Sequence, residues 1–243
     1  MNETGVTANV ELIPLGTVPT ELLPGVRAQA AQEYYLVDSI APLRYAGTAS
    51  CGGGLGRTSR FLSLHVDRRL DCEVPERFAH DRARELGVPA PFVALLTGVE
   101  NHRVRAARAR LDGPEPVQAV ALVTAGGRNL SAAGRSPVWS AAAVGTINVL
   151  AIVDAQLPDA ALLNLLTVAT EAKCLALALR GVRTEEGVPA TGTSSDAVVV
   201  AATDRGRAFQ YGGPVTVPGH LVGAAVLAAA EAALAGSRLG GGA

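Results

Sequence analysis

The chain has 243 residues and a formal net charge of −1, and 49% of its residues are hydrophobic whereas only 4% are aromatic. A chain of this length can bury one substantial core, and its composition excludes an intrinsically disordered protein. A net charge near zero gives no overall attraction to nucleic acid or to an anionic membrane, so neither is an expected partner.

The N-terminal third is predicted to lead into a hairpin. Residues 1–30 carry spaced prolines and short β-like runs, which indicate an arm over the core. Strands are expected at 32–37 and 43–49, and the second enters a glycine-rich turn at 51–54 that requires unusual backbone angles or close backbone approach. The alternating run at 60–66 is typical of the returning strand. A phosphate-binding loop is not expected, because it would be followed by a helix.

The middle of the chain is predicted to alternate helix and strand. A helix is expected at 75–86, and buried strands are expected at 92–99 and 117–125. Residues 103–111 could form either a basic helix or an exposed strand. Another small, polar loop follows the strand that ends at Ala125.

The stretch from 145 to 204 is the most informative. The apolar run 147–153 is typical of a strand buried on both faces, 160–179 of a helix ended by Gly181, and 197–202 of a second buried strand. A helix at 220–235 follows.

No linker divides the chain. We therefore predict one α/β domain at residues 31–236, with helices packed on β-sheet and a flexible tail at 237–243.

Cysteine usage and hydropathy suggest the compartment. Cys51, Cys72 and Cys174 form no CxxC pair, and no signal peptide is recognisable, which indicates a reduced, cytoplasmic protein. The run 160–179 is long enough to cross a membrane, but it contains several polar residues and lies between two strands, so a helix buried in the domain is expected instead.

The sharpest polar signal is the pair Glu171 and Lys173 within this apolar helix. Residues two apart on a helix point in different directions, so each could form a buried ion pair with another element. Alternatively, both could lie in a dry pocket with shifted pKa values. Small-residue loops nearby offer amide and hydroxyl groups suited to an oxyanion, which favours the catalytic interpretation.

Two common classes of catalytic site are not indicated. The four histidines show no metal-ligand spacing, so no metal site is predicted. A GxSxG motif is absent, so a serine hydrolase of the α/β type is not predicted either.

Five motifs, in this order, resemble the adenosylcobinamide amidohydrolase (CbiZ-type) family. They are GGGLG at 52–56, VTAG at 123–126 with Asn129 after it, GTIN at 145–148 with Asp154 after it, TEAK at 170–173, and ATGT at 190–193 with Asp196 after it. The resemblance implies hydrolysis of the amide that joins aminopropanol to the corrin ring of adenosylcobinamide, giving adenosylcobyric acid. It implies a corrinoid as the small-molecule substrate and no required cofactor.

A fainter similarity concerns the fold. The pattern at 145–157, followed by a helix, is similar to part of the ornithine acetyltransferase and DmpA-type aminopeptidase group. That similarity implies an αββα sandwich, in which helices lie outside two stacked sheets.

The resemblance and the needs of amide hydrolysis suggest roles for individual residues. Glu171 is the expected proton acceptor, acting on water or on a hydroxyl of one of three threonines, while Lys173 and Asn148 polarise the carbonyl. The threonines are Thr146, Thr191 and Thr193. The predicted substrate-binding residues are Cys51, Gly52, Gly53, Gly54, Gly126, Asn129, Asp154, Ser194, Asp196 and His220.

Departures from the family pattern leave two alternatives. An arginine expected after Asn129 is missing, ATGTGTD is ATGTSSD here, and Cys174 replaces a threonine. The scaffold could instead act on a non-corrinoid metabolite in biosynthesis, or it could bind a corrinoid or other metabolite without catalysis. The alanine-rich helices are compatible with a homodimer.

Overall fold

The computed structural model describes residues 7–66, 74–138 and 146–237. Most of its strands form one mixed sheet: β1 (Asn9–Ile13), β2 (Thr20–Leu23), β3 (Val26–Ala30), β4 (Tyr34–Gly47), β5 (Gly54–His65), β6 (Val93–Thr97), β7 (Arg105–Leu111), β8 (Val117–Ala125), β10 (Ile147–Val153) and β12 (Ala197–Ala202). The strand order is β1-β7-β8-β10-β12-β4-β3-β2, and β5 and β6 extend it from β4. Two short strands, β9 (Leu130–Ser131) and β11 (Gly192–Thr193), pair separately.

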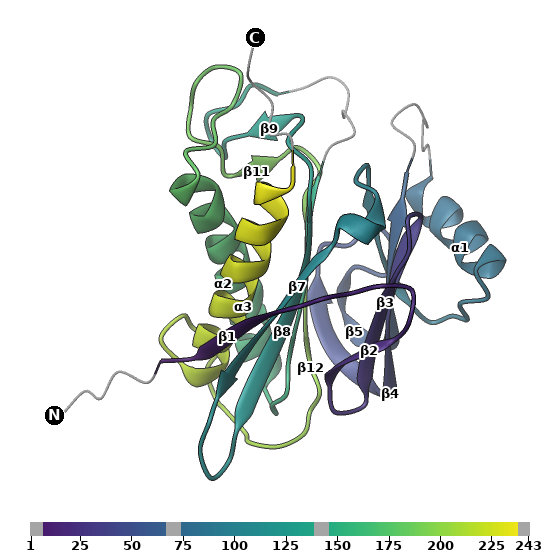
Figure 1. Cartoon of the computed structure of the whole chain (residues 1–243), viewed down its shortest axis with the longest axis vertical. Coiled ribbons are helices and arrows are strands. Elements are labelled where there is room, and N and C mark those ends of the chain that lie inside the picture. The colour runs from purple at the N-terminus through teal and green to yellow at the C-terminus, as the bar shows by residue number, and fades with distance from the viewer. Residues whose placement is uncertain (1–6, 67–73, 139–145, 238–243) are drawn as a thin grey trace, which may run out of the picture.

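In the described ranges, three helices cover the sheet: α1 (Pro75–Glu85), α2 (Asp159–Leu179) and α3 (Val217–Ala235). Helices α2 and α3 lie side by side on one half of the sheet, and α1 lies beyond the other half (Figure 1). A 3-10 turn, η1 (Asn101–Arg103), precedes β7.

The sheet bends back on itself, so that its two halves face each other and enclose an inner core. In β10, Val149 and Ala151 belong to the cluster packed under α2 and α3, whereas Leu150 and Ile152 belong to the cluster shared with Phe61 of the other half. A third cluster lies under α1. The layers therefore run helix, sheet, sheet, helix, which confirms the predicted α/β class with helices on stacked sheet layers. The two layers are halves of one continuous sheet.

The bend is located in the long strand β4. Its register with β5 shifts between Asp38 and Leu43, and such an irregularity bends a strand. Residues after the shift pair with β12, and residues before it pair with β3. The predicted strands at 32–37 and 43–49 are thus the two arms of one bent strand.

Arg108 in β7 connects the two ends of the sheet. Its Nη1 donates to Glu11 of β1 over 2.8 Å, and its Nη2 donates to the Leu22 carbonyl of β2 over 2.7 Å. Since β1 and β2 are the two ends of the strand order, this side chain closes the sheet into a nearly barrel-like form. The sequence predicts residues 1–30 to be an arm, but residues 9–30 supply three strands of the sheet.

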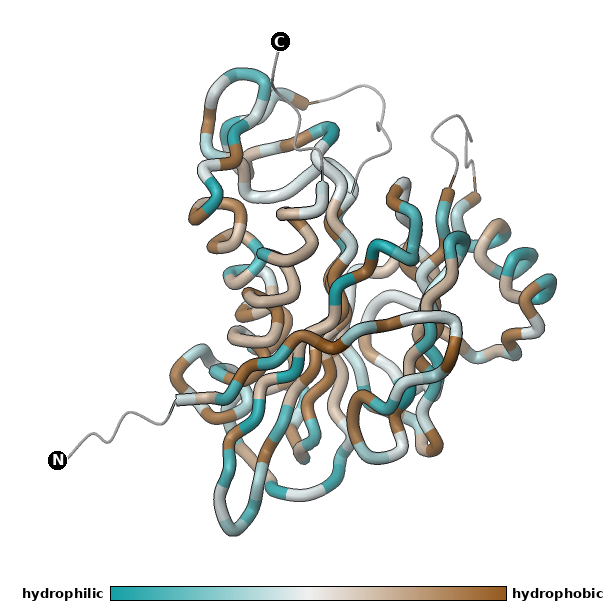
Figure 2. Tube along the Cα trace, viewed as in Figure 1, coloured by the Kyte–Doolittle hydropathy of each residue, from teal (hydrophilic) through white to brown (hydrophobic). Residues whose placement is uncertain are grey.

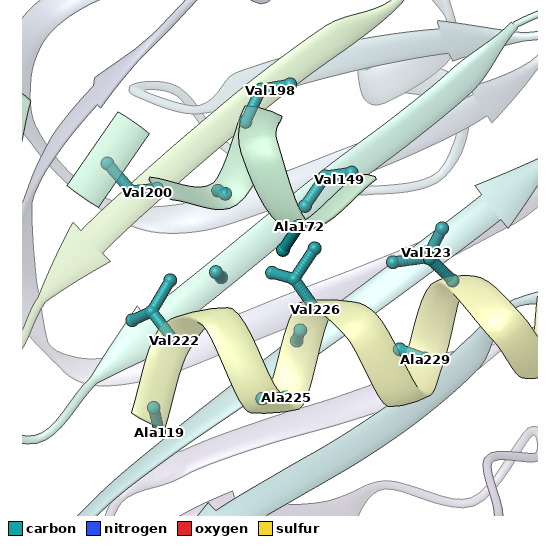
Figure 3. Packing of buried hydrophobic residues seen from close by; sticks show 14 of the residues in the cluster. Ala119, Val123, Val149, Ala172, Val198, Val200, Val222, Ala225, Val226 and Ala229 are labelled. Atoms are coloured by element: carbon teal, nitrogen blue, oxygen red, sulfur yellow. The ribbon is translucent and has the colours of Figure 1, made fainter. Parts of the chain in front are cut away.

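Small side chains allow α3 to lie close to the sheet. Val222 and Val226 of α3 point toward the sheet, with Ala172 of α2 and Val149 of β10 beside them (Figure 3). Figure 2 shows α3 in pale brown along most of its length, because alanine dominates it. Both α2 and α3 are long and apolar enough to cross a membrane, and both bury much of that length against the sheet.

Several expectations are met closely. The strands predicted at 117–125, 147–153 and 197–202 have those bounds in the structure. The undecided segment 103–111 is mainly strand β7. The predicted tail at 237–243 lies almost wholly outside the described residues.

Candidate active site at the N-terminal ends of β10 and β12

Among the described residues, at least four hydrogen-bond donors converge on the carboxylate of Asp196, in the turn before β12. The backbone amide and the hydroxyl of Thr193 donate to its two oxygens over 3.1 and 2.5 Å, and the backbone amide of Ile147 donates over 2.8 Å. The fourth donor is the ammonium group of Lys173, which also forms an ion pair with Asp196. The carboxylate is thus held where the N-terminal ends of β10 and β12 meet the C-terminal half of α2.

The phase of α2 decides which of its charged residues reaches Asp196. Lys173 lies on the buried stripe with Ala169 and Ala176, and only 7% of its side chain is exposed. Glu171 is displaced by about 200° around the helix and is exposed to solvent. Among the described residues, no hydrogen bond to Asp196 comes from Glu171. This placement gives no support to the expected role of Glu171 as proton acceptor.

Asn148 connects the cluster to the second half of the sheet. Its side-chain nitrogen donates to the Leu96 carbonyl of β6 over 2.8 Å. Its side-chain oxygen accepts from the Ala197 amide over 3.2 Å and from the Thr146 hydroxyl over 2.9 Å. Both Asn148 and Thr146 are buried, so their geometry fixes the spacing of β10, β12 and β6.

Other predicted residues form a rim around β9 and β11. The Asn129 side-chain amide donates to the Ser194 hydroxyl over 2.6 Å, and the Ser194 backbone amide donates to the Asn129 carbonyl. The Thr191 hydroxyl accepts from the Ala133 amide over 3.0 Å, and its carbonyl accepts from the Cys174 thiol. Ser194 is exposed, so a substrate can reach this rim from solvent.

Two glycines permit the close packing. A Cβ atom at Gly192 would lie 2.3 Å from Oδ2 of Asp196 and 2.7 Å from Nζ of Lys173, so a side chain there would disrupt the ion pair. The backbone amide of Gly126 donates to the Thr146 carbonyl over 3.0 Å, which holds the end of β8 beside the start of β10.

Two of the predicted pocket residues lie at the opposite end of the strands. Asp154 follows β10, so about 26 Å of extended chain separates it from Thr146. It accepts a hydrogen bond from the Thr203 hydroxyl over 2.6 Å and pairs with Arg205 at 3.1 Å. His220 is exposed in the first turn of α3, which begins at this end of the molecule (Figure 1). Neither residue belongs to the cluster around Asp196.

This opposite end also carries two surface hollows, of about 330 and 280 Å³, which share Arg44. Arg44 pairs with Asp159 and Asp204 at 3.3 Å each, and Arg57 pairs with Asp204 at 2.8 Å. The positive and negative charges balance. None of the predicted site residues lines either hollow.

The turn at Cys51–Gly54 packs on β6. Cys51 forms a backbone bridge with Ala94, and the Tyr45 hydroxyl donates to the Gly52 carbonyl over 2.7 Å. Burial raises the pKa of the Cys51 thiol, and the negative charge of Glu76 raises it further. The hydrogen bonds described for this turn join it to β4 and β6, and they do not involve Asp196.

The sequence profile of the adenosylcobinamide amidohydrolase family matches residues 20–238. The chain belongs to this family. It is 36% identical over 192 residues to the adenosylcobinamide amidohydrolase of Halobacterium salinarum, covering 75% of this chain and 76% of that protein. It is 30% identical over 198 residues to the enzyme of the same name from Methanosarcina mazei, covering 78% and 89%. The PH0078 protein of Pyrococcus horikoshii has a solved structure that aligns with a TM-score of 0.48 at 13% identity, over 96% of this chain and 85% of its own.

As a member of the adenosylcobinamide amidohydrolase family, the protein is a hydrolase that acts on an amide bond. The TEAK, GTIN and ATGT motifs, far apart in sequence, meet at Asp196 through the Lys173 ammonium, the Ile147 backbone amide and the Thr193 hydroxyl. The comparisons support neither the non-corrinoid enzyme nor the inactive binding protein.

Sequence reasoning missed three contributors to the cluster of this amidohydrolase. Two are backbone groups, the Ile147 amide and the Leu96 carbonyl, for which the side-chain sequence carries no signal. The third is Gly192, whose place inside the ATGT motif was the available signal. Gly145 of the GTIN motif lies outside the described residues.

Proposed function

We propose that this amidohydrolase cleaves the aminopropanol amide of adenosylcobinamide and releases adenosylcobyric acid. Support comes from the names of the two relatives and from the assembly of the family motifs around one carboxylate. The observation that carries the proposal is the Thr193 hydroxyl, which donates to Asp196 while Lys173 binds the other oxygen of the same carboxylate.

In the proposed reaction, Thr193 is the nucleophile. Its Oγ attacks the amide carbonyl carbon and its proton passes to Oδ1 of Asp196, which already accepts that hydrogen bond. When the C–N bond breaks, the proton moves from Asp196 to the departing amine. Water then hydrolyses the ester on Thr193, giving the carboxylic acid and restoring the hydroxyl. The ammonium group of Lys173 holds Asp196 in place and balances its charge.

We assign the role of proton acceptor to Asp196, in place of Glu171, because of where the two side chains lie. Asp196 is within hydrogen-bond distance of a hydroxyl, whereas Glu171 is exposed on α2. Access is from the exposed Ser194–Ser195 turn, which borders Thr193. In this proposal Asn129, whose side-chain amide donates to the Ser194 hydroxyl, contacts the substrate beside the scissile amide.

The test is to incubate the protein with adenosylcobinamide and to follow aminopropanol by mass spectrometry. We expect release by the wild type, partial retention in Thr193→Ser, and a loss of about 10³-fold or more in Thr193→Val. Thr170→Val is the matched control, because Thr170 is exposed on α2 and its hydroxyl donates within the helix.

Two outcomes would count against separate parts of the proposal. Full turnover by a folded Thr193→Val protein would exclude Thr193 as nucleophile. Absence of aminopropanol release by the wild type would exclude this substrate.

A further inference from the structure

A second group of reactive side chains lies away from Asp196, between α1 and the turn after β4. The thiol of Cys51, a carboxylate oxygen of Glu76 and a ring nitrogen of His80 all lie within 4.8 Å of one another. Glu76 and His80 are four residues apart on α1, so they share one face of that helix. The cluster plays no part in the proposed hydrolysis.

The three side chains are positioned differently. Cys51 is buried, and its backbone is fixed by the bridge to Ala94 of β6. The His80 ring lies against the Phe92 ring with centroids 5.0 Å apart, which restricts its orientation. Glu76 is exposed and free to adjust. The cluster therefore combines two oriented donors with one adaptable donor.

The donor set matches one class of ligand. A thiolate, an imidazole and a carboxylate are the groups that bind Zn²⁺, at about 2.0–2.3 Å from the metal. An ion at those distances would draw the donors to about 3.5–4 Å from one another. Rotation of the exposed Glu76 side chain, with a small shift of His80 that keeps its ring against Phe92, can supply that closure without moving β6.

We propose that Cys51, Glu76 and His80 form a site for a divalent zinc-type cation with three protein ligands. Because Glu76 and His80 are exposed, the fourth position faces solvent and would hold an exchangeable water. The cation links α1 to the Cys51–Gly54 turn. Sequence spacing gave no hint of this site, because Cys51 is separated from α1 by all of β5.

Co²⁺ is the probe that tests the site, because a cobalt–thiolate bond gives a charge-transfer absorption band in the near ultraviolet. The parent for the titration is Cys72→Ser/Cys174→Ser, so that Cys51 is the remaining thiol. We expect one equivalent of Co²⁺ to produce the band and Zn²⁺ to displace it. His80→Gln and Glu76→Gln should weaken Co²⁺ binding by about 10-fold or more.

Matched controls separate the site from general metal binding. His102→Gln removes an exposed histidine elsewhere and should leave Co²⁺ affinity unchanged. Added Zn²⁺ should raise the thermal unfolding midpoint of the wild type but not of His80→Gln, which replaces an exposed residue and should fold normally. No thiolate band in the parent, or equal Co²⁺ affinity in His80→Gln, would overturn the proposal. Neither readout depends on amide hydrolysis.

Discussion

Lys173 of α2 and Asp196 of the turn before β12 form a buried ion pair, although they are 23 positions apart in the sequence. The two side chains are 7% and 11% exposed, so each depends on the other for its partner charge. Removing one partner of such a pair is costly, because the remaining charge stays buried.

Lys173→Met is therefore predicted to lower the free energy of unfolding by about 3–5 kcal/mol and to abolish hydrolysis. Urea denaturation and aminopropanol release measure the two effects. Glu171→Gln, on the exposed face of the same helix, should change stability by less than about 0.5 kcal/mol and leave turnover intact. Adding Asp196→Asn to Lys173→Met should recover part of the stability but none of the activity. Full additivity of the two substitutions would contradict the direct pairing.

Gly192→Ala is predicted to disturb the same pair by steric overlap. The new methyl group would lie 2.3 Å from Oδ2 of Asp196, so the carboxylate or the strand must shift, at a cost of about 1–3 kcal/mol. Hydrolysis should fall by about 10²-fold, since small displacements of reacting groups are expensive. Gly16→Ala is the control, because a Cβ atom there meets nothing within 4 Å. Equal turnover of the two variants would argue against a tight cluster.

Asn148→Leu is predicted to weaken the connection between the two sheet layers. It would leave the Leu96 carbonyl and the Ala197 amide without their partner, at a total cost of at least about 2 kcal/mol. Chemical denaturation would measure this loss, and Asn164→Leu on the exposed face of α2 is the control. A loss no larger than that of the control would show that the layers are held together without Asn148.

The two described cysteines are predicted to react slowly with thiol reagents at neutral pH. Burial raises the pKa of Cys174; Lys173 opposes this effect, while Asp196 and Glu171 add to it. Burial and Glu76 likewise raise the pKa of Cys51. In the metal-free protein both groups should be protonated thiols at neutral pH, and their alkylation by iodoacetamide should accelerate as the pH is raised.

The same reasoning predicts that Cys174→Thr retains hydrolysis. Rapid alkylation of Cys174 at pH 7, accompanied by loss of turnover, would reverse this assignment and make Cys174 a candidate nucleophile.

The strands that could be predicted from sequence are those whose two faces are both buried, so that nearly every residue is apolar. β10 and β12 are apolar on both faces because helices cover one side and the second sheet layer covers the other. The segment that became β7 was undecided, since its alternating alanine and arginine residues suit either an amphipathic helix or a strand. The sheet strands β1 to β3 were missed because each is short and depends on partners distant in sequence.

The site was only partly predictable for a related reason. The motifs named Lys173, Thr193 and Asp196, but nothing in the sequence states that these three meet. Glu171 is charged within an apolar run, which suggests a function, and only the packing of α2 shows that it faces solvent. Asp154 follows the GTIN motif, yet the direction of β10 places it at the other end of the strands, and His220 lies at that same end in the first turn of α3.

Arg108 holds β1 and β2 together where the two ends of the sheet meet, because it binds a residue of each strand. Proteolytic removal of residues up to Leu23 would remove both strands and leave β7 and β3 as free edges. Free edges pair readily with other copies of the same chain. The strands β1 and β2 thus protect the protein from aggregation by covering these edges, and a shortened chain that begins after Leu23 should self-associate.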